Sequence, residues 1–299
     1  MKRALIISVI AIVIFAGCTK KQTVTLDFPV IITDSSAEKQ MTFDELIENL
    51  KGSNLISVGE IHTDSLTHVI EKKILKSVYS GNRNITVALE MFERDVQKYL
   101  DDYLSGKIDE ETFLKNSRPW NNYKTAYRPL IEFAKNNNLA VLAMNVPRRY
   151  AAIVARKGGE GLSTIPDSEK VWIAKNLKAL DDEYRKRFVE LMTGGDKPMP
   201  MKHMNPQKMY EAQCLKDDTM AESIVSYLTE HPEKTVFTCE GSFHSNYRLG
   251  FIKKVLLLEP ELKVSVISVV PVKDLQNIKF EEHKGLGDFI IFVKGESAR

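Results

Sequence analysis

Three short apolar segments of the chain end in side chains that can carry out acid–base or metal chemistry. The segments and the residues that follow them are 55–58 with Gly59-Glu60-Ile61-His62, 85–89 with Glu90, and 235–239 with Glu240-Gly241-Ser242-Phe243-His244. Imidazole titrates near neutral pH, and burial can raise the pKa of a glutamate into the same range. Glu60, His62, Glu90 and His244 are therefore candidates for an acid–base set, or for a hydrolytic metal site with an open coordination position. The alternative is that each histidine only caps the end of a strand.

A second group of candidates follows the apolar segment 139–144. Pro147 is placed to open a helix, and Arg148, Arg149 and Tyr150 come directly after it. Arginine binds carboxylates through two parallel hydrogen bonds, and a tyrosinate can be an axial ligand of haem iron. The pattern suits a porphyrin with its propionates. The alternative is that the arginines lie on the surface beside a half-buried tyrosine and bind no ligand.

The segment 193–204 is rich in methionine and contains His203 and Met204. Thioethers select soft metals, so a Cu(I) site is one interpretation. A pliable apolar lid over a flat ligand is another, and a loop whose methionines pack on neighbouring helices is a third. In the helix expected over 206–230, one face mixes Gln213 and Asp217 with Tyr210 and apolar residues, as a pocket wall or a solvated helix edge would.

The elements that must position these groups alternate between strand and helix, which predicts an α/β fold with a mainly parallel central sheet flanked by helices. Polar groups after parallel strands converge on the crevice at the carboxyl ends of those strands. Besides the three segments above, strands are expected near 30–32 and over 139–144, 264–269 and 289–293. Helices are expected over 43–50, 64–80 and 206–230, with a helical cap in the same domain over about 93–137 and 160–230.

Composition excludes some classes of protein. A formal net charge of +2 with 27% charged residues gives no indication of a nucleic-acid partner. Beyond Cys18 the chain has only Cys214 and Cys239, so a disulfide-stapled scaffold is not expected, and both thiols are predicted to be buried and inert. A chain of this length can stabilise itself by burying a core.

The first residues of the chain predict localisation to the cell envelope. Residues 1–17 have the positive start and short apolar stretch of a signal peptide, which is too short to span a membrane. Cys18 directly after Ala16 and Gly17 is similar to a bacterial lipobox, in which the cysteine is lipidated, for example with palmitate. We expect residues 18–40 to be a lipid-anchored tether and residues 41–299 to be the folded domain. An ordinary signal peptide with an incidental cysteine is the alternative.

Taken together, these motifs resemble the ChaN-like haem-binding lipoproteins, relatives of the Tiki proteases, the TraB proteins and the erythromycin esterases. The resemblance covers about 40–290. It rests on Gly59-Glu60-Ile61-His62, Ala88-Leu89-Glu90-Met91, Asn145-Val146-Pro147-Arg148, residues 212–221 and Gly241-Ser242-Phe243-His244.

The resemblance implies a haem-binding lipoprotein for haem or iron uptake, anchored at Cys18 in the outer membrane and facing the periplasm. It implies a homodimer that encloses two stacked haems, each iron held by a tyrosine, and an outer-membrane haem receptor as a partner. Tyr150 is the first candidate ligand, Tyr247 and Tyr210 are alternatives, and further haem contacts are expected from Arg148, Arg149, His203 and Met204. The absence of Cys-x-x-Cys-His from the sequence excludes covalent haem attachment. A hydrolase that activates water with Glu60, His62, Glu90 and His244 is the alternative function.

Overall fold

Eight strands form one sheet in the computed structural model, which describes residues 26–36, 38–194 and 205–295. Their order across the sheet is β2-β1-β8-β7-β3-β6-β4-β5. The strands are β1 (Val30–Asp34), β2 (Gln40–Met41), β3 (Leu55–Glu60), β4 (Ile85–Glu93), β5 (Val141–Asn145), β6 (Thr235–Gly241), β7 (Val264–Val272) and β8 (Phe289–Lys294). The pairs from β8 to β5 are parallel, and β1 is antiparallel to both β2 and β8. The expected mainly parallel sheet is confirmed.

The central strands β3, β4 and β6 are buried along their whole length. Helices cover both faces of a parallel sheet, so such strands appear in the sequence as continuous apolar runs. This is why their positions were predictable. Their ends were less so, because β4 continues beyond the expected end at residue 89 and Glu90 lies within the strand.

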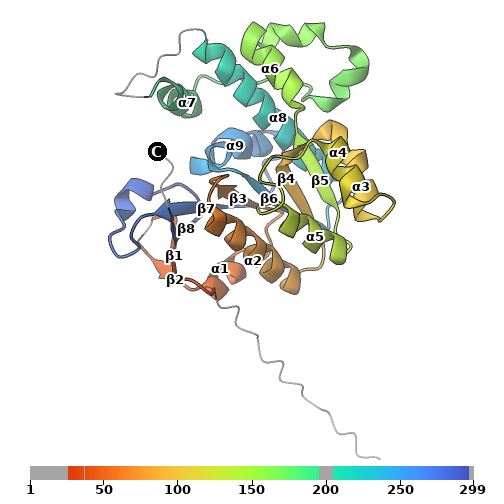
Figure 1. Ribbon diagram of the computed structural model, residues 1–299. Coiled ribbons are helices and arrows are strands. Elements are labelled where there is room, and N and C mark those ends of the chain that lie inside the picture. Colours follow the sequence, from red (N-terminus) through yellow and green to blue (C-terminus); the bar gives the residue numbers. More distant parts are fainter. Residues whose placement is uncertain (1–25, 37, 195–204, 296–299) are drawn as a thin grey trace, which may run out of the picture.

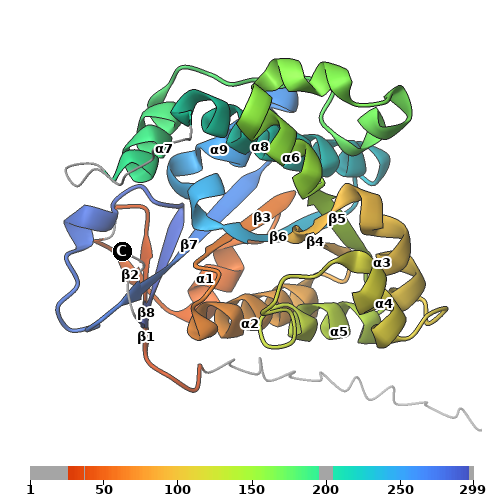
Figure 2. The ribbon, with the colours of Figure 1, turned by 45° about the horizontal axis from the view of Figure 1, so that its top comes forward.

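Helices cover both faces of the sheet (Figures 1 and 2). The helices are α1 (Phe43–Asn49), α2 (Ser65–Gly81), α3 (Gln97–Leu104), α4 (Glu110–Ser117), α5 (Arg128–Asn136), α6 (Arg148–Lys157), α7 (Glu183–Thr193), α8 (Pro206–Glu230) and α9 (Gly250–Leu258). Side chains of α1 to α5 share the larger core with one face of the sheet, and α8 and α9 form a second core with strand residues such as Leu55 and Val236. Helix α9 was not among the elements expected from the sequence.

Local sequence explains how the first helices begin. Thr42 and Glu45 form a capping box at α1, in which each side chain accepts a hydrogen bond from the other residue's backbone N–H group. Asp64 accepts a hydrogen bond from the backbone N–H of Thr67 at 2.8 Å and so caps α2. The start of the crossover helix after β3 is thus set by a polar residue just beyond the strand.

The two segments expected to form a cap differ in the structure. Residues 97–136 pack into the larger core as α3, α4 and α5, whereas α6, α7 and the first turns of α8 lie beyond the edge of the sheet (Figure 1). Within the expected cap over about 160–230, residues 166–193 contain one short 3₁₀ helix, Asp167–Trp172, before α7 begins at Glu183. Asp182 caps α7, which sets the late start of that helix.

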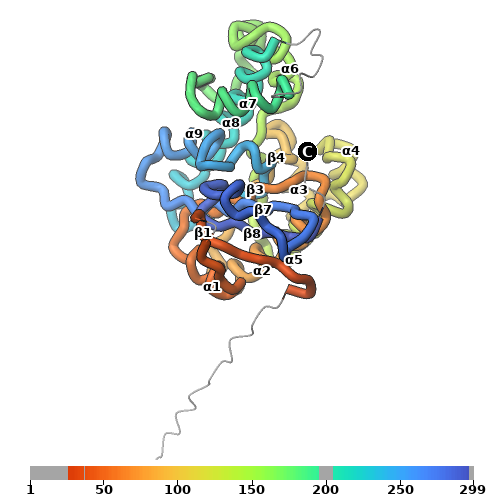
Figure 3. The backbone as a smooth tube through the Cα atoms, turned by 90° about the vertical axis from the view of Figure 1, so that its left-hand side faces the viewer, coloured from red at the N-terminus to blue at the C-terminus, as the bar shows by residue number. Residues whose placement is uncertain are grey.

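The folded part of the chain begins earlier than expected. The strand expected near 30–32 is confirmed as β1, which pairs with β8 over Val30–Asp34 and buries Ile32. The sheet therefore begins within the segment 18–40 that was assigned to the tether. Strands from opposite ends of the sequence therefore lie side by side (Figure 3). Cys18, the expected signal peptide at 1–17, His203 and Met204 lie outside the described residues. Among the helices of the described ranges, none has the length and apolar character needed to cross a bilayer.

Strand order places a crevice at one edge of the sheet. From β3 the chain crosses by α2 to β4, and from β6 it crosses by α9 to β7, on the other side of β3. The direction of winding therefore reverses between β3 and β6. Open α/β sheets bind ligands beyond the carboxyl ends of the strands at such a reversal, and His62 and His244 follow these two strands.

Candidate functional site

A cavity of about 680 Å³ lies beyond the carboxyl ends of β3, β4 and β6. Its lining residues are Glu60, Ile61, His62, Thr63, Glu90, Glu93, Trp120, Asn145, Val146, Arg148, Gln213, Lys216, Gly241, Ser242, Phe243 and His244. A second cavity of about 660 Å³ shares His62, Thr63, Trp120 and Arg148 with the first and continues past His68. We call the two cavities together the trough. Glu60, His62, Glu90 and His244 were expected to converge on one site, and all four line the first cavity.

The register of β3 and β6 explains how the two similar motifs differ. Gly59 pairs with Glu240, and Glu60 pairs with Gly241. Neighbours in register lie on the same face of a sheet, so Glu60 and Glu240 are on opposite faces, each beside a glycine. Glu240 is fully buried, accepts a hydrogen bond from Ser57, and does not line the trough. The two similar motifs therefore place their glutamates, Glu60 and Glu240, in different environments.

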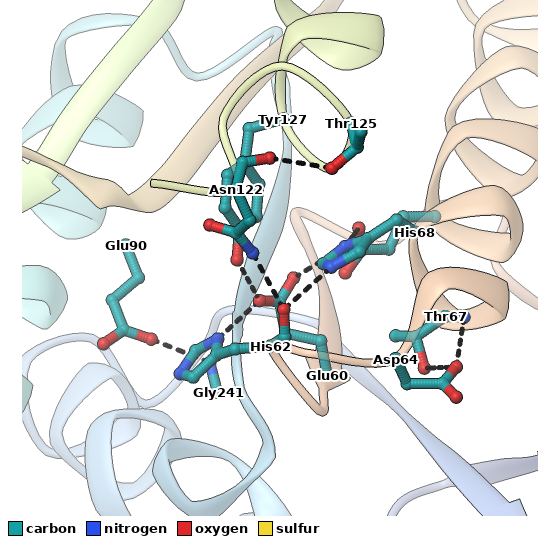
Figure 4. A network of polar contacts seen from close by, with 11 residues as sticks. Glu60, His62, Asp64, Thr67, His68, Glu90, Asn122, Thr125, Tyr127 and Gly241 are labelled. Carbon is teal, nitrogen blue, oxygen red and sulfur yellow. Dashed lines mark hydrogen bonds and ion pairs between the residues drawn. The ribbon is translucent and has the colours of Figure 1, made fainter. Parts of the chain in front are cut away.

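Glu60 is the centre of a buried network on the α2 face (Figure 4). Its Oε1 atom lies 2.5 Å from Nδ1 of His62 and accepts a 2.7 Å hydrogen bond from the hydroxyl of Tyr127. Nδ1 of His68 lies 3.0 Å from Oε2 of Glu71 and 3.6 Å from Oε2 of Glu60. This network connects the floor of the trough to helix α2 and to Tyr127, the N-cap residue of α5.

The carboxyl groups of this network have opposite pKa shifts. Burial would raise the pKa of Glu60, but contacts with Glu71 and His62 outweigh burial and lower it. Burial and the charge of Glu60 raise the pKa of Glu71 well above its ordinary range. Burial would lower the pKa of His62, but the hydrogen bond to Glu60 and the charge of Glu90 outweigh it and raise the value. His62 thus has an ionised carboxylate on one side, and its side chain is 37% exposed to the trough.

His244 is the centre of a second network, on the α8 face. Its Nδ1 lies 2.6 Å from Oδ1 of Asp217, and its Nε2 lies 3.3 Å from Oε1 of Glu90. Glu90 also accepts a 2.7 Å hydrogen bond from the backbone N–H of Gly241. Burial would lower the pKa of His244, but the charges of Glu90 and Asp217 outweigh it and raise the value to about 10. His244 is therefore a cation at neutral pH and a hydrogen-bond donor, and it is poorly suited to act as a base.

Cationic and aromatic groups border the trough. Arg148 has a 65% exposed side chain and donates a 2.8 Å hydrogen bond to Glu93, and Lys216 lines the same cavity. The Trp120 ring stands edge-on to His62, with ring centres 4.8 Å apart. Both cavities can thus offer apolar walls and positive charge to one ligand.

The three tyrosines considered as iron ligands have different surroundings. Tyr150 on α6 is 2% exposed, donates a hydrogen bond to Glu169 and accepts one from Arg149. Tyr210 on α8 is also buried and donates to the backbone carbonyl of Leu180 at 2.8 Å.

Tyr247 lines a cavity of about 350 Å³ that shares Phe243 with the trough. Its backbone φ is +60°, and the guanidinium of Arg187 lies 3.9 Å from the centre of its ring. None of the three tyrosines lines the trough, and Tyr247 lines the 350 Å³ cavity that adjoins it at Phe243. The identity of the iron ligand stays a prediction.

Sequence reasoning missed two members of the site. His68 and Glu71 were not singled out, although they lie three residues apart on the buried face of α2, where paired polar groups are unusual. Asp217 and Gln213, which were noted as a helix face, do reach His244. The free thiols Cys214 and Cys239 are buried, as predicted.

Comparisons with known proteins found a matching family model and similar solved structures. A family model described as "Haem-binding uptake, Tiki superfamily, ChaN" matches residues 46–255. A solved structure of cofacial haem binding to ChaN of Campylobacter jejuni is similar, with a TM-score of 0.67 and 19% identity over 89% of this chain and 97% of that one. An erythromycin esterase mutant, EreC in its open conformation, gives a TM-score of 0.47 and 12% identity over 86% of this chain and 82% of that one.

A curated relative covers a smaller part of the chain. Protein RETICULATA-RELATED 5, a chloroplastic protein of Arabidopsis thaliana, is 26% identical over 123 residues, which is 39% of this chain. The match spans 17% of the length of that relative. It adds no argument about the trough.

Proposed function

The chain belongs to the haem-binding uptake family of the Tiki superfamily that includes ChaN, and on this premise we propose that it binds haem in the trough and serves haem or iron uptake. The observation that carries the proposal is the trough itself. Its lining residues fall within the segment that the family model matches, and they combine apolar walls with cationic groups. A haem is flat and mostly apolar with two carboxylates, so it needs an apolar slot, cations and an axial ligand.

The residues present fit such a ligand. Ile61, Trp120, Val146 and Phe243 supply apolar surface in the first cavity. Arg148 and Lys216 would pair with the propionates, Arg148 through its free guanidinium nitrogens. Bound haem would supply an iron centre for transport, and the protein groups would hold and orient it.

A tyrosinate completes the proposed haem site. The position of Tyr247 beside Phe243 supports it as the first ligand to test. Tyr150 would have to leave Glu169 and Arg149, and Tyr210 would have to leave Leu180, before either could reach iron. Arg149 is proposed to contribute to the wall of the trough behind Arg148, where it binds Asp95 and Tyr150.

The remaining parts of the proposal concern place and partners. We propose a lipid anchor on Cys18, attachment to the outer membrane on its periplasmic side, and a homodimer that forms around haem. His203 and Met204 are proposed as additional haem contacts, and an outer-membrane receptor as the source of haem. The lipobox-like sequence at Ala16-Gly17-Cys18 supports the anchor.

A haemin titration tests haem binding directly. The chain from residue 21 onward contains every described residue, so it is titrated with haemin and followed by its visible spectrum. We expect saturable binding at about one haem per chain with a high-spin ferric tyrosinate spectrum. A free-haemin spectrum without saturation would refute the proposal.

Matched variants place the ligand in the trough. Arg148→Gln and Lys216→Gln should each weaken haemin binding about tenfold, since each removes a charge-assisted contact. Lys279→Gln, at an exposed site paired with Glu282, is the control and should bind like the parent. His62→Ala should weaken binding only modestly, because we do not propose His62 as the iron ligand.

A hydrolase is the second candidate function. The Glu60–His62 contact supports it, because a buried carboxylate 2.5 Å from an exposed imidazole orients a general base. His62 would be the base, since His244 is already protonated at neutral pH. Turnover on ester or peptide substrates that disappears in His62→Ala would support this function, and no turnover across both panels would leave haem binding alone.

A further inference from the structure

Behind the trough floor, three buried side chains converge that the haem proposal does not use. One donor atom from each of Glu60, His68 and Glu71 lies within 4.8 Å of the others, and all three residues are buried. We call them the inner cluster. We propose that the inner cluster binds a divalent transition-metal ion of the zinc class, independently of whether haem occupies the trough.

The tautomer of His68 is fixed by its surroundings. Its Nε2 lies 3.1 Å from the backbone carbonyl oxygen of His62, which can only accept a hydrogen bond. Nε2 therefore carries a proton, and Nδ1 is the ring atom that faces the carboxyl groups of Glu71 and Glu60. Nδ1 is thus the atom that would donate its lone pair to a metal ion.

Two carboxyl oxygens in the cluster have no hydrogen-bond partner. They are Oε2 of Glu60 and Oε1 of Glu71, and both side chains are fully buried. Buried polar atoms are normally hydrogen-bonded, and buried charges are normally paired or bound to metal. A divalent ion would satisfy both oxygens.

The positions of the donors are fixed by other residues. Oε1 of Glu60 is held by His62 and Tyr127, which leaves Oε2 free to face the cluster. The carbonyl of His62 that holds His68 also accepts a 2.9 Å hydrogen bond from Asn122. Metal-binding histidines are commonly oriented in this way, by donating their other ring N–H to a backbone carbonyl.

The spacing suits a small ion. Donor atoms around a tetrahedral zinc ion lie about 3.3 Å apart, given bond lengths of about 2.0 to 2.1 Å. The distances from Nδ1 of His68 are 3.0 Å to Glu71 and 3.6 Å to Glu60. One imidazole nitrogen and two carboxylates are donors that zinc and neighbouring metals accept. His68 also lines the second cavity of the trough, which gives an entry path from solvent.

Metal binding to the full chain, purified without an affinity tag and stripped with chelator, tests the proposal. Zn²⁺ is added in a calorimeter and in a thermal unfolding assay. We expect one Zn²⁺ per chain and a melting temperature that rises with Zn²⁺ concentration. Absence of binding by the parent protein would overturn the proposal.

Variants distinguish the inner cluster from the rest of the trough. Glu71→Gln should weaken Zn²⁺ binding at least a hundredfold and abolish the rise in melting temperature. Glu240→Gln removes an equally buried carboxylate that is not a donor, and Glu90→Gln removes one from the His244 network; both should keep the binding. Retained Zn²⁺ binding in Glu71→Gln would overturn the assignment. Loss of binding in Glu90→Gln alongside that result would point to the His244 network instead.

A milder variant covers the case in which Glu71→Gln does not fold. Tyr127→Phe keeps the ring but removes the hydroxyl that holds Glu60, and should weaken Zn²⁺ binding about 10- to 100-fold. X-ray absorption of the zinc-loaded parent should show one imidazole among oxygen donors. Affinity unchanged in Tyr127→Phe together with a spectrum lacking imidazole would place the metal elsewhere.

Discussion

At Glu60 one carboxylate connects two sites. Oε1 faces His62 and Tyr127 at the trough floor, and Oε2 faces His68 and Glu71 behind it. His62 and His244, which look equivalent in the sequence, differ because His244 lies between two carboxylates and His62 is partly exposed. Chemistry at the trough therefore depends on pairings that a motif does not reveal.

The iron ligand is tested by removing single hydroxyl groups. Tyr247→Phe should abolish the tyrosinate band of the haem complex and leave the fold intact, because only the hydroxyl is lost. Tyr150→Phe removes hydrogen bonds with Glu169 and Arg149, so it should lower stability by about 1 kcal/mol and keep the band. Visible spectra and urea unfolding of both variants decide between them, and a lost band in Tyr150→Phe would return the role to Tyr150.

Gly241 leaves room for the ring of His62. A Cβ atom at this position would lie 2.7 Å from Nε2 of His62. Gly241→Ala should displace the imidazole, break its contact with Glu60 and lower the free energy of unfolding by about 2 kcal/mol. Gly81→Ala, where an added Cβ would meet nothing within 4 Å, is the control. Equal unfolding curves for the two variants would contradict this account.

Glu240 gives a pH dependence with a defined sign. Burial raises its pKa from the ordinary 4.5 to about 7, although a hydrogen bond from Ser57 opposes the rise. The folded state thus binds this proton more tightly than the unfolded state. Its stabilising contribution is fully present below pH 4.5 and is lost as the pH rises through 7, a change of about 3 kcal/mol.

Glu240→Gln should remove this loss. Urea unfolding measures the free energy of unfolding of variant and parent at pH 4 and at pH 8. Between pH 4 and pH 8, the difference between variant and parent should change by about 3 kcal/mol in favour of the variant. Glu281→Gln, at an exposed position, is the control. A difference that is the same at both pH values would show that Glu240 has an ordinary affinity for its proton.

At the scale of elements, strands set the order of the site and helices complete it. The register of β3 with β6 alternates glutamate and glycine across the pair, so each carboxylate lies beside a residue without a side chain. Helix α2 brings His68 and Glu71 to one face, and α8 brings Gln213 and Asp217 to the other. A change at the start of either helix should therefore reach the site.

The N-cap of α2 tests this connection. Asp64→Ala removes the acceptor for the backbone N–H of Thr67 and should lower the free energy of unfolding by about 1 kcal/mol. Asp109→Ala removes the equivalent cap of α4, with a similar loss of stability, and serves as the control. Only Asp64→Ala should also weaken Zn²⁺ binding, as measured by calorimetry. Equal Zn²⁺ affinity in both variants would show that the inner cluster does not depend on the start of α2.

At the scale of the whole molecule, the trough is open to solvent and has apolar walls, and a flat ligand within it would expose one face. Two protomers that close over two stacked haems would bury those faces about a two-fold axis. A ligand that binds the dimer more tightly than the monomer shifts the equilibrium by mass action. A lipid anchor on Cys18 would raise the local concentration of protomers on one membrane.

Haem-dependent association follows from this arrangement. The chain from residue 21 onward should be largely monomeric without haem and dimeric with about one haem per chain. Sedimentation of both forms at the same protein concentration measures the change. A haem-saturated monomer would refute the stacked pair and leave single-haem binding intact, whereas an equally strong dimer without haem would mean that protein surfaces alone hold it.

The sequence by itself determined the class of fold, the central strands and the residues at their carboxyl ends. Buried parallel strands require unbroken apolar runs, and strand order confines the following polar residues to one crevice, so Glu60, His62, Glu90 and His244 were found from local patterns. The start of α1 and the length of α8 were likewise local, because capping residues and Pro206 mark them.

Only the tertiary structure decided what those residues contact. Asp217 and Glu90 come from distant parts of the chain, yet together they make His244 a cation. His68 and Glu71 looked like ordinary positions on an amphipathic helix until packing placed them against Glu60. The surroundings of Tyr150 and Tyr247 depend on neighbours in α6, α7 and the segment after β6. Protonation and accessibility arise from neighbours in space, and the chain order of one sequence does not contain them.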